Sequence, residues 1–163
     1  MSKSISQIRQ EFDGADEKSG EELCRLYAGD ARAGVQNLIA RYRRRQAALK
    51  KERARLDEMM FYEKKYSGYE RICGIDEAGR GPLAGPVVAG AVILPKDCEI
   101  LGVDDSKKLS VKKRELLYDE IMEKAVAVSV GIVSPERIDE INILQATYEA
   151  MREAAAGLGT EPD

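Results

Sequence analysis

The sequence predicts an α/β fold, with an all-helical segment over residues 1–68 and a three-stranded sheet with flanking helices over residues 69–163. Three observations lead to this class. Apolar residues recur at helical spacing through the first part. A short apolar run and a second apolar run rich in Val and Ile flank a loop of glycine and proline near residue 80. A third run, at 125–133, alternates small and β-branched residues.

The first part contains three expected helices. The first spans about Ser4 to Phe12. The second begins at Ser19, which stands three residues before Glu22 in a capping-box pattern. The third begins after Asp30, which can cap it, and continues to about Lys65.

The third helix carries an unusual concentration of positive charge, opposed locally only by Glu52. Its basic residues are Arg41, Arg43, Arg44, Arg45, Lys50, Lys51, Arg53 and Arg55. The net charge of the whole chain is -3, but the basic residues are concentrated before residue 71. Because like charges repel at helical spacing, such a helix favours an anionic neighbour, and nucleic acid is the leading candidate. A solvated charged helix is the alternative interpretation.

The second part is organised by the stretch from Ile72 to Leu94. It contains a short apolar strand, the carboxylates Asp76 and Glu77 at its end, a loop of glycine and proline, and a second apolar strand. We expect strand order to be lost at the two acids, so that their side chains escape strict alternation and converge on one ion. The alternative is a plain turn with solvated carboxylates.

Four glycines around the two acids allow close approach of a ligand because they lack side chains: Gly74, Gly79, Gly81 and Gly85. Arg80 offers a cation and exposed amides to a phosphate or sugar. Its alternative role is that of a surface arginine in a hairpin loop. The glycines do not match the dinucleotide-binding pattern, and a Walker loop is absent from the sequence.

Composition restricts the kind of metal that these acids could hold. The chain has no histidine and three scattered cysteines, which argues against a zinc site and against a disulfide framework. A metal would be held by oxygen, which points to magnesium or manganese. No run approaches membrane-spanning length, and the N-terminus lacks the apolar segment of a secretory signal, so the expected location is the cytoplasm.

Two helices complete the second part. Ser110 can cap a helix from Val111 to Lys124, whose expected buried residues are Leu116, Leu117, Ile121 and Tyr118. Ser134 and Pro135 start another helix. A helix is then expected from about Leu144 to Ala156, contributing Leu144, Thr147, Tyr148 and Met151 to the core.

Three segments resemble motifs of the ribonuclease HII family, in the family's order. The first is Gly74-Ile-Asp-Glu-Ala-Gly-Arg-Gly-Pro-Leu-Ala-Gly-Pro-Val-Val-Ala, the second is Asp105-Ser-Lys-Lys-Leu-Ser, and the third is Ile138-Asp-Glu-Ile-Asn-Ile-Leu-Gln-Ala-Thr. The resemblance covers about Arg71 to the C-terminus. The basic helical segment before it is similar to the N-terminal extension of some bacterial members.

The resemblance implies a ribonuclease H-like fold and an endonuclease that hydrolyses the RNA strand of RNA/DNA hybrids or cuts at a ribonucleotide in duplex DNA. Two divalent ions, manganese or magnesium, would be shared by four acids. Asp76 and Glu77 match the first two acids, as catalytic and metal-binding residues. Gly79, Arg80 and Gly81 would read the 2′-hydroxyl through backbone groups.

The same resemblance places Ser106 and Lys107 near the substrate, whereas Asp105 to Ser110 could equally be a capped helix entry with surface lysines. It further implies that the chain stops before the third acid. In the family a strand carries this acid, and Asp163 matches the residue just before that strand. We therefore expect poor metal binding, little cleavage, and an exposed edge at Ile72 to Asp76; the complete enzyme is expected to be a monomer. A non-catalytic nucleic-acid-binding fragment is the alternative. A small-molecule phosphatase would leave the basic helix unexplained.

Overall fold

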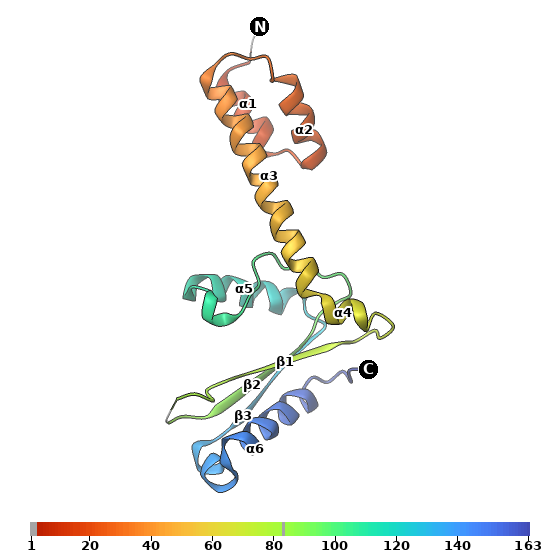
Figure 1. Cartoon of the computed structure of the whole chain (residues 1–163), viewed down its shortest axis with the longest axis vertical. Coiled ribbons are helices and arrows are strands. Elements are labelled where there is room, and N and C mark those ends of the chain that lie inside the picture. The colour runs from red at the N-terminus through yellow and green to blue at the C-terminus, as the bar shows by residue number, and fades with distance from the viewer. Residues whose placement is uncertain (1–2, 83) are drawn as a thin grey trace. The chain divides into compact units, whose positions relative to one another are not determined.

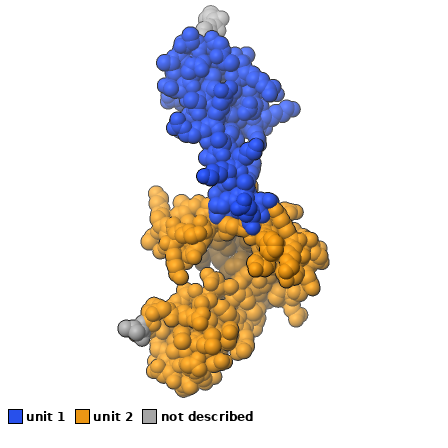
Figure 2. Space-filling model, in the orientation of Figure 1, with its two compact units in different colours: residues 1–58 blue, residues 59–163 orange. Residues whose placement is uncertain are grey.

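The computed structural model describes residues 3–82 and 84–163. The chain divides into two compact units, residues 1–58 and 59–163 (Figure 2). The first unit contains only helices among its described residues, and the second contains a three-stranded sheet with helices (Figure 1). The predicted α/β class is therefore confirmed. The division places residues 59–68 with the sheet, while the expected domain boundary at residue 68 stays a prediction.

The first unit begins with α1 (Ile5–Asp13) and α2 (Glu17–Leu26). Ser4 caps α1 in a capping box with Gln7. The expectation that Ser19 caps α2 is wrong, because Asp16 takes that place and accepts a 2.8 Å hydrogen bond from the Ser19 amide. An aspartate is as effective a cap as a serine, so the helix starts one turn earlier.

The long helix α3 spans Ala33–Met59, and a separate short helix, α4, spans Phe61–Lys65. The expectation of one helix continuing to about Lys65 is therefore wrong. Asp30 does not cap α3 directly but accepts hydrogen bonds from the backbone and side chain of Arg32, just before α3 begins. The apolar pattern continues through the break at Met60, which is why sequence periodicity missed it.

The core of the first unit joins its three helices through six buried residues: Ile8, Phe12, Cys24, Val35, Ile39 and Tyr42. The Tyr42 hydroxyl donates a 3.0 Å hydrogen bond to the Glu17 carbonyl. A Cβ atom at Gly20 would lie 2.2 Å from the Tyr42 ring. The glycine therefore permits α2 and α3 to approach closely at this point.

The sheet of the second unit is antiparallel and has the order β1-β2-β3. Its strands are β1 (Cys73–Ala78), β2 (Val87–Ile93) and β3 (Ala127–Val133). Strand β1 therefore has no neighbour on its outer edge within the described residues, as expected for Ile72 to Asp76.

Helix α6 (Pro135–Ala156) covers one face of this sheet (Figure 1). Alternate residues of β2, such as Ala89 and Ala91, are fully buried against Ala146, Ala150 and Ala154 of the helix. A Cβ atom at Gly131 would lie 2.1 Å from the Ala150 carbonyl oxygen, so strand and helix touch backbone to backbone. Small residues make this close approach possible, which increases dispersion contacts.

Two of the residues expected in the core of α6, Leu144 and Tyr148, are exposed, so that part of the prediction is wrong. Thr147 is buried as expected, and its hydroxyl donates a 2.7 Å hydrogen bond to the Ile143 carbonyl. Leu144 and Tyr148 lie beside the alanine face that the sheet accepts, whereas Met151 packs against the core as expected.

A short 3-10 helix, η1 (Ser106–Lys108), precedes α5 (Val111–Lys124), which has the predicted bounds. Ser110 caps α5 as expected, accepting a hydrogen bond from the Lys113 amide. Leu117 is buried, but Leu116 and Tyr118 are exposed, contrary to expectation. Two lysine side chains of the helix donate hydrogen bonds to the segment before it, Lys113 to the Leu101 carbonyl and Lys124 to the Glu99 carbonyl. Its apolar side is partly uncovered.

Candidate metal and nucleic-acid site

The two candidate catalytic acids lie inside a regular strand. Strand β1 continues through Ala78, with Asp76 paired to Gly90, Glu77 to Ala89 and Ala78 to Val88. The expectation that strand order is lost at the acids is therefore wrong. Pairing with β2 holds the backbone extended for two residues beyond Asp76. The pairing partners belong to β2, on the far side of the loop, so the sequence around the acids does not reveal them.

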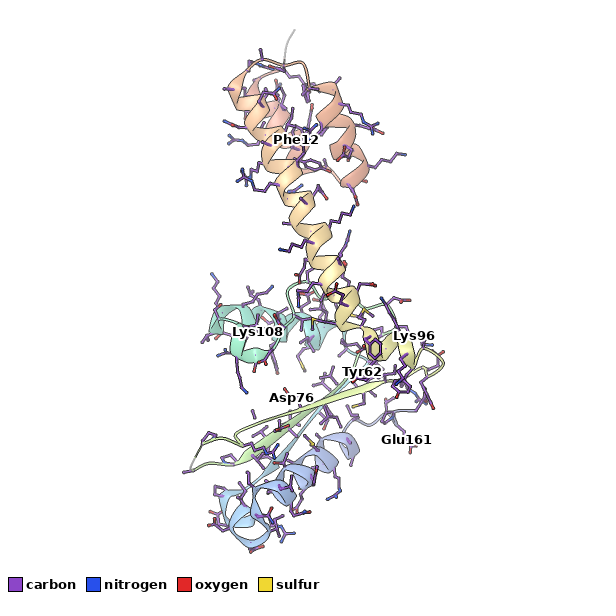
Figure 3. The ribbon with its side chains drawn as sticks, viewed as in Figure 1. Phe12, Tyr62, Asp76, Lys96, Lys108 and Glu161 are labelled. Atoms are coloured by element: carbon purple, nitrogen blue, oxygen red, sulfur yellow. The ribbon has the colours of Figure 1, made fainter. Side chains whose placement is uncertain are left out.

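Regular strand geometry separates the two carboxylates, because successive side chains point to opposite faces of a sheet. Glu77 shares the face of its partner Ala89, which is buried against α6. Asp76 shares the other face with Gly90, and it is exposed on β1 (Figure 3). The expected convergence of both side chains on one ion is thus not found in this structure.

The Glu77 carboxylate is engaged by the arginine of the loop. Arg80 Nη1 donates to Glu77 Oε1 over 3.3 Å, and the Glu77 side chain is only 23% exposed. Arg80 therefore neutralises the less accessible acid, while Asp76 faces solvent. An approaching anion could recruit Arg80, and this exchange would release Glu77 for a cation.

The loop backbone between β1 and β2 explains two of its glycines in different ways. Gly79 has a φ of +86°, and a Cβ there would lie 2.4 Å from the Pro86 carbonyl oxygen. This glycine is needed to close the hairpin. Apart from its chain neighbours, no atom of the described residues lies within 4 Å of the Cβ position of Gly81, so the backbone there is open to a ligand. Leu83, within the same motif, lies outside the described residues.

The second candidate segment is the turn at η1. Asp105 accepts a 2.8 Å hydrogen bond from the Lys107 amide, and the Ser106 and Lys107 side chains are exposed. Arg114, which the sequence motifs did not indicate, donates to the carbonyls of Ser106 and Leu109. Arg114 lies one helical turn after the cap of α5, and this position could have indicated its contact with the preceding turn. The segment is thus a braced turn that presents Lys107 outward.

The structure brings Asp76, Glu77, Gly79, Arg80 and Gly81 together in one hairpin. Within residues 3–82 and 84–163, no hydrogen bond or ion pair joins Ser106 or Lys107 to this hairpin, and no cluster of three or more acidic, cysteine or histidine side chains could hold a metal. The two carboxylates are therefore an incomplete ligand set.

Comparison with known proteins agrees with this arrangement of motifs. The family model for the ribonuclease HII N-terminal domain matches residues 4–67, and the model for ribonuclease HII matches residues 73–163. The chain belongs to the ribonuclease HII family. All seven predicted site residues lie within the second match, and the basic run of α3 lies within the first.

Curated members of the ribonuclease HII family are similar to the chain over its whole length. The ribonuclease HII of Lachnoclostridium phytofermentans is 55% identical, over 100% of this chain and 64% of its own. That of Bacillus cytotoxicus is 50% identical, over 99% of this chain and 61% of its own. The chain thus spans about three-fifths of the length of these relatives. Among solved structures, the chain is similar to the crystal structure of ribonuclease H2 from Pyrococcus horikoshii, with 36% sequence identity and a TM-score of 0.49. The match covers 56% of this chain and 46% of that chain.

The basic run in the N-terminal ribonuclease HII segment lies on α3. Arg41, Arg44 and Lys50 are exposed, whereas Arg55 is paired with Glu52. Arg45 lies over the Tyr42 ring, 5.5 Å from its centroid. In residues 3–82 and 84–163, no helix combines the length and the apolar character needed to cross a bilayer.

The terminal residue Asp163 is held at the entry to β1. Its carboxylate accepts hydrogen bonds from the amides of Glu70 and Arg71 and from the Arg71 guanidinium. The amide hydrogen bonds, together with the positive charge of Arg71, lower the pKa of Asp163 below its usual range. Asp163 therefore stabilises the entry to β1 and is not a metal ligand in this structure.

Proposed function

We propose that the whole protein is an endoribonuclease that hydrolyses the RNA strand of RNA/DNA hybrids and cuts at single ribonucleotides in duplex DNA. The observation that carries this proposal is the ribonuclease HII match over residues 73–163, which contains the acid pair and the loop that follows it. A DNA replication or repair role, a cytoplasmic location and a monomeric state belong to the same proposal.

Asp76 and Glu77 supply carboxylate oxygens, the donors that magnesium and manganese prefer. When bound, such ions would supply an activated water and stabilise the leaving oxygen of the phosphodiester. Asp76 is the accessible ligand. Glu77 becomes available when Arg80 turns from its carboxylate toward a phosphate of the substrate. The donors fit the ions in kind, but two carboxylates alone leave the ligand set incomplete.

Selection of the ribonucleotide rests on the loop after β1. The 2′-hydroxyl is the group that distinguishes RNA from DNA. The backbone at Gly81 is open, so its amide can approach a sugar without interference from a side chain. Gly79 contributes to this contact by the bend of its backbone, and Arg80 contributes by its positive charge. Ser106 and Lys107 contact a neighbouring phosphate.

The exposed basic side chains of α3 contribute affinity without sequence preference, because neutralising phosphates releases counterions. These 163 residues by themselves are expected to cleave slowly or not at all, since only two of the four acids that would hold the metal ions are available. A non-catalytic nucleic-acid-binding role is the second candidate, favoured by the basic helix and the incomplete ligand set.

The test is incubation of the chain with a DNA duplex containing one ribonucleotide, in the presence of manganese. Asp76→Asn is the variant, and Asp119→Asn, an exposed acid on α5, is the matched control. Slow cleavage that only Asp76→Asn abolishes supports the nuclease. Salt-sensitive binding with no product favours the binding role, and cleavage that survives Asp76→Asn contradicts the assignment of this residue.

A further inference from the structure

Four aromatic side chains with no role in the core occur within nine residues, on α4 and the turn that follows it. Phe61, Tyr62, Tyr66 and Tyr69 are between 44% and 63% exposed. We call them the aromatic surface. Large apolar side chains gathered on an exposed surface are typical of a binding site, because leaving them in water forgoes the free energy of burial.

The rings of the aromatic surface do not cover one another. Phe61 and Tyr62 meet edge to face, with centroids 5.2 Å apart. Tyr66 and Tyr69 are 6.3 Å apart and tilted by 59°. Neither pair is stacked in parallel, and each ring is partly exposed, so part of its surface remains open to a planar partner.

Lysines are interleaved with these rings. Lys65 Nζ lies 5.3 Å from the centroid of the Tyr66 ring. Lys96, from the turn after β2, donates 2.7 Å and 3.4 Å hydrogen bonds to the Glu70 carboxylate and the Ser67 carbonyl, which fixes it beside the turn (Figure 3). The Lys96 charge is partly balanced by Glu70, whereas Lys65 is held over an aromatic face.

This combination distinguishes between two kinds of partner. The centre of a protein interface is enriched in aromatic residues but depleted of lysine and glutamate. Surfaces that bind single-stranded nucleic acid instead alternate aromatic rings, on which bases stack, with cations that follow the phosphates. The lysines among the rings favour the second kind.

We propose that the aromatic surface binds unpaired nucleobases of a single-stranded nucleic acid by stacking. Phe61 and Tyr62 receive the bases, and Lys65 and Lys96 face the phosphates that join them. This activity goes beyond the proposed cleavage of hybrids, because it needs neither a ribonucleotide nor a metal. It would allow the protein to engage an unpaired strand in addition to a duplex.

The test measures binding of a fluorescein-labelled oligomer of twelve deoxythymidines by anisotropy, in EDTA so that cleavage plays no part. The double variant Phe61→Ala/Tyr62→Ala is expected to lower affinity at least about ten-fold, since each stacked base contributes substantially. Tyr62→Phe keeps a ring and should bind like the native chain. Tyr118→Ala, an equally exposed tyrosine on α5, is the matched control and should have no effect.

A second probe separates stacking from phosphate contacts. An abasic oligomer of the same length keeps the phosphates but has no bases, so the native chain should bind it at least about ten-fold more weakly. Equal binding of the two oligomers would overturn the proposal and assign the affinity to basic residues alone. Absence of binding to the deoxythymidine oligomer, or full affinity in the double variant, would also overturn it and leave the aromatic surface to a protein partner.

Discussion

The Arg80 guanidinium lies 3.3 Å from the Glu77 carboxylate, three residues earlier in the same hairpin. This ion pair joins a residue proposed to contact the substrate with one proposed to bind the metal. It implies that Arg80 and a divalent cation compete for the same carboxylate.

Removal of Arg80 should therefore strengthen metal binding. We expect Arg80→Ala to raise the affinity of the chain for manganese, by up to about five-fold, because an exposed ion pair contributes at most about 1 kcal/mol. Calorimetric titration with manganese measures this. Lys107→Ala, which removes a cation that does not contact Glu77, should leave the affinity unchanged. A decrease with Arg80→Ala would instead mean that the arginine positions the carboxylate for the metal.

Gly79 is expected to be essential for the hairpin. Gly79→Ala places a Cβ atom against the Pro86 carbonyl at a positive φ, which should cost about 1–3 kcal/mol of unfolding free energy. Gly81→Ala meets no neighbour among the described residues and has no positive φ, so it should change stability by less than about 1 kcal/mol. Urea unfolding of the full chain compares the two. Equal stability of both variants would show that the loop relaxes around the added methyl group.

The exposed basic side chains of α3 should determine how binding to duplex depends on salt. Replacing Arg41, Arg44 and Lys50 by glutamine is expected to reduce the slope of log affinity against log salt by about one for each phosphate that is no longer neutralised. The control triple variant changes Lys18, Lys112 and Arg152, which are exposed elsewhere. Titrations at several salt concentrations give the slopes. An identical decrease of the slope in both variants would mean that α3 contributes no more than other basic surface residues.

Asp30 should make the first unit sensitive to acid. Hydrogen bonds from Arg32 lower the pKa of Asp30 to about 2. Since the folded-state pKa lies below the unfolded value of about 3.9, its contribution is present above about pH 4 and is lost as the pH falls toward 2. Asp30→Asn should abolish this part of the pH dependence in circular dichroism titrations of the full chain. Asp13→Asn serves as control, and an unchanged profile in Asp30→Asn would contradict the assignment.

Local patterns allowed much of the second unit to be predicted. The bounds and cap of α5, the start of α6 at Pro135 and the three strands follow from capping residues, proline position and β-branched alternation, all of which act over a few neighbouring residues. The helical nature of the first unit was equally evident. The end of α3 and the cap of α2 were not, because several nearby residues could fill each role.

The members of the candidate site could be predicted from local sequence, because the acid pair, the glycines and Arg80 are contiguous in one motif. The direction in which their side chains point depends on long-range strand pairing. Pairing of Glu77 with Ala89 extends β1 beyond Asp76 and places the two carboxylates on opposite faces. Likewise, the contact of Gly131 with Ala150 selects the alanine face of α6 for the core in place of its larger residues. Both outcomes depend on partners distant in sequence, whose backbone positions no local pattern specifies.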